Sequence, residues 1–294
     1  MVEGDLLSLF HASGRRMQIS GKKQKAKKEA KIVQNPSAST VSSAHPSIPA
    51  PTALVEYTEE GNVVQLLKGM VVLRNVVPTD VQQRILDEAF RLGKQRENTV
   101  DAQGDTGFFT TDPVSGTMRL NQGSRGRLIV GMEHVEDFMS VLCRQWVEQA
   151  HAHDATIPLD MVPTICLMNY YHHDGTFKWH VDSEHPDDVK AKCGPPIVSV
   201  TIGDSCEFGF KEDYDAPTHR TVTLNSGDVL LFGGPARMVV HSVLRIIPTP
   251  RPPGLKMPPN GRLNITLRDV RKGTVDTMLF PMYRVSYGSG DSRQ

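Results

Sequence analysis

The stretch that decides the fold is Thr164-Ile165-Cys166-Leu167-Met168-Asn169-Tyr170-Tyr171, the first of a series of short β-type runs. Each run is four to eight residues long, rich in branched or aromatic side chains, and bounded by Gly, Asp, Asn or Pro. Spacing of this kind predicts a sandwich or jelly roll. The eight candidate strands are Thr164–Tyr171, Phe177–Val181, Ile197–Ile202, Glu207–Phe210, Thr221–Leu224, Val229–Phe232, Met238–Val243 and Leu263–Arg268.

Helical patterns precede these strands. Met70-Val71-Val72-Leu73 predicts one earlier strand, and Thr79 and Gln82 after it have the capping-box spacing of a helix start. Gly93 can end this helix. Its apolar face consists of Val81, Ile85, Ala89 and Leu92. A second helix is indicated by the stripe Val135, Phe138, Met139, Leu142 and Trp146, with Trp146 in the core. The fold class expected is mainly β with flanking helices (α+β).

Two segments have irregular patterns. Residues 98–127, rich in Gly, Thr, Asp and Ser, predict a long polar loop, and loops of that length tend to be functional or mobile. Ile246 to Gly261 contains six prolines and cannot be a central strand, so we expect an extended surface loop there.

The N-terminal segment differs from the rest in composition. Residues 1–55 predict a disordered tail, basic from Arg15 to Lys31 and then rich in Ser, Ala and Pro, whereas residues 56–294 predict a single domain. The basic part has the two-cluster form of a nuclear-localisation signal. The alternative is a solvated tail that contacts nucleic-acid phosphates, and the two can coexist.

Composition excludes some classes of protein. The 294 residues carry 33 basic and 33 acidic side chains, so the chain as a whole does not attract polyanions. Its apolar runs fall short of the ~18 residues that a membrane span needs. The four cysteines lack a Cys-x-x-Cys spacing, which is typical of reduced, intracellular thiols. We therefore expect neither a membrane protein nor a secreted one.

His180-Val181-Asp182, followed at a distance by His241, is a candidate metal site. Side chains alternate across a strand, so His180 and Asp182 are expected on one face, where both can bind one ion. Two imidazoles and one carboxylate form the facial arrangement of non-haem Fe(II) oxygenases. A His-x-Asp pair by itself could equally be a surface contact; the order of pair, distant His and the strand Arg262-Leu263-Asn264-Ile265-Thr266-Leu267-Arg268 favours the metal.

With these residues in view, the chain resembles the AlkB family of Fe(II)- and 2-oxoglutarate-dependent dioxygenases. The resemblance extends to Cys166–Tyr171, to Pro196–Gly203 and to Gly227–Gly234, and covers about residues 161–270. It implies a double-stranded β-helix, a form of jelly roll, with the metal inside one end. It also implies Fe(II), 2-oxoglutarate and O2 as cofactor and co-substrates.

The resemblance assigns roles to five further residues. Arg262 matches the arginine that clamps the distal carboxylate of 2-oxoglutarate, and Arg268 the one near its metal-proximal carboxylate; either could instead form a salt bridge at the rim. A planar guanidinium suits this task because it can bind a carboxylate through two parallel hydrogen bonds. Asn169, Tyr171 and Asn264 match positions that hydrogen-bond the co-substrate, although each could be a satisfied core polar group.

Residues on the substrate side are less constrained. Glu184 follows Asp182 by two positions, where an acceptor could read an exocyclic amino group; a solvated loop carboxylate is the alternative. In the family, substrate-gripping loops lie at the position of residues 98–127. The candidates there are Phe108, Phe109, Arg119, Arg125 and Arg127, the rings for stacking and the arginines for phosphate contacts.

The implied reaction is oxidative N-demethylation of alkylated or methylated bases in DNA or RNA, as in DNA repair or RNA modification. Co-substrate is converted to succinate and carbon dioxide, and the hydroxylated methyl group leaves as formaldehyde. The alternatives are a protein or small-molecule hydroxylase with the same iron site and a non-enzymatic binding module. We expect a monomer with a nucleic-acid substrate, in the nucleus or in nucleus and cytoplasm. The sequence leaves open which methylated base is the target.

Overall fold

The computed structural model describes residues 58–93, 109–111, 114, 118–120, 127–183, 186–257 and 261–270. All of them belong to Ala53–Gln294, the second of two units into which the chain divides. The predicted tail, residues 1–55, lies outside the described residues. In the described part of the chain no helix is long and apolar enough to span a membrane.

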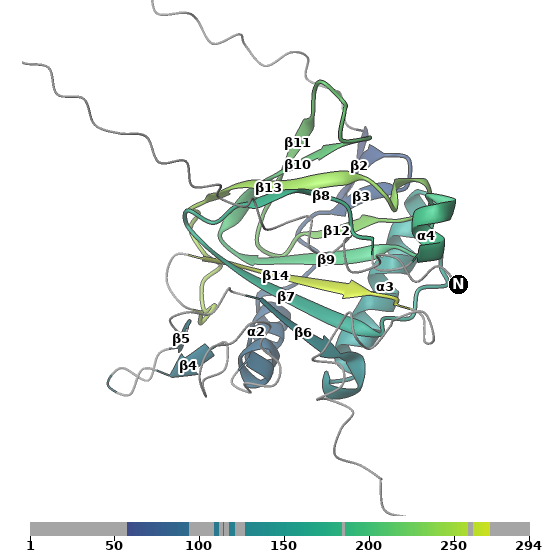
Figure 1. Cartoon of the computed structure of the whole chain (residues 1–294). Coiled ribbons are helices and arrows are strands. Elements are labelled where there is room, and N and C mark those ends of the chain that lie inside the picture. The colour runs from purple at the N-terminus through teal and green to yellow at the C-terminus, as the bar shows by residue number, and fades with distance from the viewer. Residues whose placement is uncertain are drawn as a thin grey trace, which may run out of the picture. The chain divides into compact units, whose positions relative to one another are not determined.

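The core of the molecule is two antiparallel sheets that face each other (Figure 1). The large sheet has eight strands, in the spatial order β1 (Thr58–Glu60), β2 (Val63–Leu67), β3 (Met70–Leu73), β12 (Val229–Phe232), β9 (Ile197–Gly203), β14 (Gly261–Arg268), β7 (Ile165–His172) and β6 (Arg127–Gly131). The small sheet has the order β11 (Arg220–Leu224), β10 (Ser205–Lys211), β13 (Val240–Ile247) and β8 (Phe177–His180). This arrangement is the predicted double-stranded β-helix, and all eight candidate strands are confirmed.

Helices α2 (Thr79–Gly93) and α3 (Phe138–His153) pack on the outer face of the large sheet (Figure 1). Both were expected, and Trp146 is buried as predicted. The capping box was wrong: the helix already includes Thr79, and the Gln82 amide donates to the carbonyl oxygen of Val77 at 2.8 Å. The other helical segments among the described residues are α4 (Pro186–Ala191) and the short 3-10 turns η2 (Met132–His134) and η3 (Gly234–Ala236).

The two segments expected to be irregular are partly ordered. Within residues 98–127 the chain forms a two-stranded sheet of β4 (Phe109–Thr111) and β5 (Met118–Leu120), so this segment is not simply a loop. The Pro-rich segment begins later than expected, because β13 continues to Ile247. Residues 248–257 contain neither helix nor strand.

The large sheet separates two apolar clusters, and β14 shows how. Leu263, Ile265 and Leu267 are fully buried on the face that packs against α2 and α3. Strand alternation places the other side chains on the opposite face, toward the small sheet. These are Arg262, Asn264, Thr266 and Arg268, all of them buried. The second apolar cluster, which includes Phe208, Phe210 and Phe232, fills the rest of the space between the sheets.

Two irregularities interrupt the small sheet. His241 of β13 pairs with His180 of β8, but Val243 pairs with Phe177, so three steps along β8 match two along β13. On the other side of β13, Phe208 pairs with Val243 and Glu207 with Arg245, which leaves Leu244 as an extra residue. Both are β-bulges, which reset the alternation of side chains between the faces of a strand.

Candidate metal and co-substrate site

A cavity lies between the two sheets, and the residues predicted for the site converge on it. Its walls come from β7, β8, β9, β10, β12, β13 and β14 and from the segment after β8. The lining residues are Leu167, Asn169, Tyr171, Phe177, His180, Asp182, Ile197, Ser199, Phe208, Phe232, His241, Val243, Arg262, Asn264, Thr266 and Arg268.

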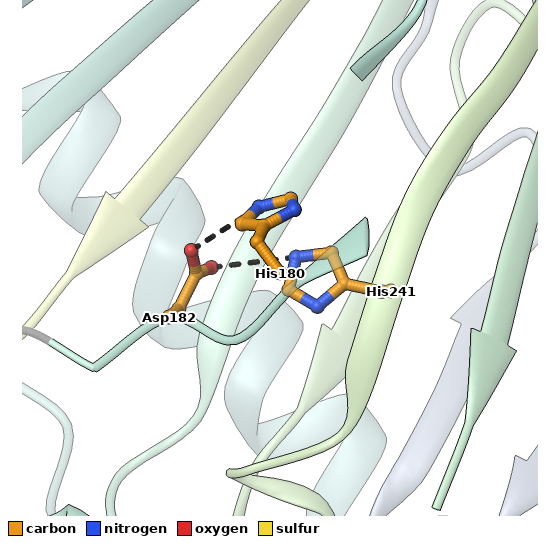
Figure 2. Close-up of side chains that lie close together, drawn as sticks. All are labelled: His180, Asp182 and His241. Carbon is orange, nitrogen blue, oxygen red and sulfur yellow. Dashed lines mark ion pairs between the residues drawn. The ribbon is translucent and has the colours of Figure 1, made fainter. Parts of the chain in front are cut away.

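His180, Asp182 and His241 form a compact group of metal-ligand atoms, all within 4.8 Å of one another. Nε2 of His180 lies 3.6 Å from Oδ1 of Asp182, and Nε2 of His241 lies 3.7 Å from Oδ2. Figure 2 shows the carboxylate directed at both rings. One expectation was wrong: β8 ends at His180, so Asp182 reaches this face from beyond the strand and not through strand alternation.

Backbone carbonyls orient both imidazoles. Nδ1 of His180 lies 2.8 Å from the carbonyl oxygen of Lys178, and Nδ1 of His241 lies 3.0 Å from that of Val239. A carbonyl only accepts hydrogen bonds, so each Nδ1 carries the proton and donates it. Each Nε2 is then left with a lone pair that faces Asp182, which is the form in which histidine binds metals.

The surroundings of the site favour a neutral His180 and an ionised Asp182. Burial, and then the neighbouring His241, lower the pKa of His180 to about 4. Burial opposes ionisation of Asp182, but Arg268 and the two imidazoles hold the pKa of this carboxyl well below its usual range. Nη2 of Arg268 lies 3.0 Å from Oδ2 of Asp182. This donor set matches the preference of a divalent iron ion.

Arg262 lies at the buried end of the cavity wall and is 1% exposed. Its Nη2 donates to Oγ1 of Thr201 at 2.9 Å, and its guanidinium lies 5.4 Å from the centre of the Tyr171 ring. Among the described residues, Nε and Nη1 have no hydrogen-bond partner. A buried guanidinium in this state is costly unless an anion pairs with it, so the site fits a ligand carboxylate.

The amide of Asn264 is engaged within the protein. Its Nδ2 donates to Oγ of Ser199 at 2.7 Å and to the carbonyl of Val200 at 3.1 Å, and its Oδ1 accepts from Thr266 at 3.2 Å. Asn169 is the partner of Asn264 across the β7–β14 ladder and lines the same cavity, as does Tyr171. Their contacts with a co-substrate remain predictions.

The predicted substrate-side residues are described only in part. Glu184, Phe108 and Arg125 lie outside the described residues. Phe109, Arg119 and Arg127 belong to β4, β5 and β6, of which the backbone is described at these positions. Arg127 on β6 is the register partner of Asn169 on β7. Strand β7 lies between β6 and the cavity-lining β14.

Sequence reasoning missed several residues that shape the site by contacting the predicted metal ligands and co-substrate residues. The rings of Phe208 and Phe232 lie 5.5 and 5.1 Å from His241, and Ser199 and Thr201 support Asn264 and Arg262. The alternation Val198-Ser199-Val200-Thr201 was a usable signal for a polar inner face on β9. Arg237, which contacts the backbone of Asp182, was also missed.

Comparison with known proteins agrees with this geometry. Residues 69–268 match the model of the 2OG-Fe(II) oxygenase superfamily. The chain is 31% identical over 241 residues to a DNA N(6)-methyladenine demethylase, ALKBH1D, of Arabidopsis thaliana, covering 73% of this chain and 52% of the relative. It is 33% identical over 109 residues to an alpha-ketoglutarate-dependent dioxygenase AlkB homolog of Caulobacter vibrioides, covering 37% of this chain and 46% of the relative. The chain thus spans about half the length of these curated relatives.

A solved structure supports the same relationship. The structure of OsALKBH1 superposes with a TM-score of 0.53 at 27% sequence identity, covering 70% of this chain and 99% of the other. The family match covers most of the described residues and contains the whole cavity wall. The chain therefore belongs to the 2OG-Fe(II) oxygenase superfamily, as an AlkB-like member.

Proposed function

We propose that this chain is an Fe(II)- and 2-oxoglutarate-dependent dioxygenase that removes N-methyl groups from the bases of a nucleic acid. The observation that carries the proposal is one cavity with three metal-ligand side chains and, on its wall, a buried arginine with two N–H groups lacking a partner among the described residues. The choice of substrate class rests on relatives named as a DNA demethylase and as an AlkB homolog.

Iron would be held by Nε2 of His180, Nε2 of His241 and one carboxylate oxygen of Asp182. When bound with 2-oxoglutarate and O2, it supplies the oxidising power to hydroxylate a methyl group, with succinate and carbon dioxide as co-products. The three ligands approach from one side, which leaves room for co-substrate on the cavity side. Arg268 balances the charge of Asp182 at 3.0 Å and helps to fix its orientation.

The co-substrate would extend along β14 from the metal to Arg262. Arg262 would pair with its distal carboxylate through the unengaged Nε and Nη1, and Arg268 would lie beside its metal-proximal end. Asn169, Tyr171 and Asn264 would border it. Strand alternation accounts for the spacing, because Arg262, Asn264 and Arg268 project from the same face of one strand.

The apolar part of the cavity wall would exclude water from the reaction. Leu167, Ile197, Phe208, Phe232 and Val243 line the same space as the polar residues. Water exclusion strengthens the interaction between Arg262 and a carboxylate, because the local dielectric constant falls. It also protects a reactive oxidant from side reactions.

A methylated base would reach the metal from a single strand or after leaving its stack. We propose that the segment from Asn98 to Arg127 forms one wall of the substrate groove. Arg119, Arg125 and Arg127 would contact phosphates, Phe108 and Phe109 would stack on the base, and Glu184 would read an exocyclic amino group. Replacing the three arginines with Ala should then raise the apparent KM for the nucleic-acid substrate, and the increase should be largest at low salt.

The test is a panel of methylated DNA and RNA oligonucleotides and methylated histone peptides, incubated with the full chain, Fe(II), 2-oxoglutarate and ascorbate. We expect formaldehyde and a matching mass loss of one CH2 unit from an oligonucleotide, because N–H replaces N–CH3, and neither change with a His180→Ala control. Turnover of peptides alone would replace this proposal with a protein demethylase or hydroxylase.

We further propose a monomer that enters the nucleus by means of the basic segment Arg15 to Lys31. Deleting residues 1–51 should leave the melting temperature nearly unchanged, because the segment lacks a core-forming pattern. The deletion should shift a fluorescent fusion toward the cytoplasm. An unchanged distribution would remove the targeting role.

A further inference from the structure

The three metal-ligand residues are held in different ways. His180 and His241 are register partners on paired strands, so the ladder between β8 and β13 fixes both of them. Asp182 lies in the segment after β8, where residues 181–183 belong to neither helix nor strand. Its carboxylate is nevertheless buried and directed at both rings (Figure 2). Some contact other than strand pairing must hold this segment.

Arg268 contacts the carboxylate of Asp182, and Arg237 contacts its backbone. Nη1 of Arg237 donates a hydrogen bond to the backbone carbonyl of Asp182 at 2.5 Å. Arg237 follows η3 directly, and its backbone N–H bonds to the carbonyl of Gly234, so its own main chain is fixed. Four residues later the chain reaches His241. One side chain thus joins the segments that carry the second and third metal ligands.

The same guanidinium is tied to α4. Nε of Arg237 lies 3.6 Å from Oδ2 of Asp188, and both side chains are buried, at 3% and 5% exposure. Burial lowers the pKa of Arg237, whereas the charges of Asp182 and Asp188 raise it. A buried arginine needs compensating carboxylates, and Asp188 supplies one that is not a metal ligand.

The packing around this pair leaves it little freedom. The segment after α4 is bonded directly to η3, because Gly234 N–H donates to the carbonyl of Gly194 at 2.8 Å. A Cβ atom at Gly194 would lie 2.5 Å from Cγ of Asp188. Glycine at this position therefore lets Asp188 approach Arg237, and the carboxylate is confined by backbone on that side.

We propose that Arg237 is a positioning residue for the metal ligand Asp182, with Asp188 as its buried counter-ion. The proposal rests on the metal site of the proposed function. Its consequence is that α4, which follows Asp182 at the metal end of the cavity, is fixed to the ligand segment as one unit. Removal of a residue that holds a metal ligand in place, without itself binding the metal, weakens metal affinity by about 10- to 100-fold.

The test compares Arg237→Met, Arg237→Lys and Asp188→Asn in the full chain, with Arg245→Met as the matched control. Arg245 lies on the same stretch of chain and pairs with Glu207 at 2.7 Å, but it is 68% exposed and outside the cavity wall. Affinity for Co(II) is measured by calorimetry on metal-free protein well below its melting temperature. Backbone hydrogen exchange at residues 181–183 is measured without metal.

We expect Arg237→Met to weaken Co(II) binding by about 10- to 100-fold, and Asp188→Asn and Arg237→Lys to weaken it less. Exchange at residues 181–183 should accelerate in the same order, and Arg245→Met should match the parent in both measurements. At saturating metal the KM for 2-oxoglutarate should stay within about threefold of the parent, because Arg262 is untouched.

A lower melting temperature with Co(II) affinity and local exchange unchanged would overturn the proposal, since Arg237 would then be a structural ion pair alone. If Arg237→Met does not fold, Arg237→Lys and Asp188→Asn decide by the same two readouts. Failure of the proposed function looks different: the parent itself, and not only the variants, would bind Co(II) no better than His241→Ala.

Discussion

Both faces of β14 are buried, but one is apolar and the other carries polar and charged side chains. Toward α2 and α3 the strand presents Leu263, Ile265 and Leu267, which fill a close-packed apolar cluster. Toward the small sheet it presents Arg262, Asn264, Thr266 and Arg268, which line the cavity. The first face gains free energy of folding from burial. The second places charged groups where solvation is lost, which costs free energy unless a ligand pairs with them.

Alternate residues of one strand therefore serve different purposes: one set stabilises the fold, and the other set lines the ligand cavity. Substitutions on the helix-facing side should lower stability and leave ligand binding intact in the folded fraction. Substitutions on the cavity side should weaken ligand binding and change the stability of the fold much less. Three predictions test this division, from the largest expected effect to the smallest, and a fourth concerns a buried polar residue that belongs to neither face of β14.

The largest effect is expected at the metal ligands. His241→Ala should abolish metal-dependent succinate formation, because it removes one of three ligands that converge within 4.8 Å. The melting temperature should change little, since apolar packing and not the ion holds the sheets together. Succinate assays and circular dichroism on the same sample separate the two effects. Turnover at the parental rate would exclude His241 as a ligand.

The second prediction concerns the helix-facing side. Ile265→Ala should lower the free energy of unfolding by about 2–5 kcal/mol, because it leaves a cavity in a close-packed core. Urea titration gives this value. The KM for 2-oxoglutarate, measured at low temperature on folded protein, should match the parent. A KM that rises along with the loss of stability would mean that the two faces of β14 are coupled.

The third prediction is the reciprocal experiment on the cavity side. Arg262→Ala removes charge-assisted hydrogen bonds worth roughly 1.5–3 kcal/mol. The apparent affinity for 2-oxoglutarate should therefore fall by about 10- to 100-fold. Metal affinity should persist. Stability should fall less than in Ile265→Ala, since the substitution also removes a buried charge with unsatisfied N–H groups. Unchanged saturation by 2-oxoglutarate would place the clamp elsewhere.

The smallest effect concerns Asp154, a buried polar residue outside the cavity wall. Its Oδ2 accepts from Gly69 N–H at 2.6 Å and Gln65 at 2.7 Å, and its Oδ1 accepts from Thr156. Burial alone would raise its pKa, but the hydrogen bonds from Thr156 and Gly69, together with the charge of Lys68, hold the pKa below its usual value of 3.8. Asp154→Asn should lower the free energy of unfolding by about 1–3 kcal/mol at neutral pH.

The pH dependence of that cost has a definite sign. A carboxyl with a lower pKa in the folded state stabilises the fold above its unfolded pKa, and this stabilisation is lost as pH falls through the folded value. The gap between parent and Asp154→Asn should therefore narrow below about pH 4. Urea titrations from pH 7 to pH 3 measure it. A constant gap would show that the ionised form of Asp154 is not the stabilising one.

Much of the fold could be predicted from the sequence because alternation is a local signal. The strand Leu263–Arg268 and the polar positions on it were readable without tertiary information. Strand β6 was missed because Arg127–Gly131 follows a polar, Gly-rich segment with no clear start signal. The capping box at Thr79 failed because Gln82 has a tertiary partner, Ser226, which no local rule can anticipate.

The site likewise contains residues that could be predicted from the sequence and residues that could not. The order of His180, Asp182 and His241 along the chain carried enough information to predict one compact group, and their ligand atoms do lie within 4.8 Å of one another. Arg237 gave a weaker signal, a lone charge in the run Gly233-Gly234-Pro235-Ala236-Arg237-Met238-Val239. Its contact with Asp182 spans 55 positions of sequence and depends on the backbone beyond a strand end. Neither alternation nor motif spacing describes such a contact.

The bulges of the small sheet have a consequence for folding fidelity. In a regular antiparallel ladder, a slip of two residues returns each side chain to its original face, so a misregistered pairing can persist. Here Phe177 and His180 line the same cavity although they are three positions apart, and Val243 and Ile246 are both buried at the same separation. A slipped pairing of β8 with β13 would place either Phe177 or His180 on the wrong face, and a slipped pairing of β10 with β13 would do the same to Val243 or Ile246. The irregular ladder therefore disfavours slipped alignments relative to the one that sets His180 opposite His241.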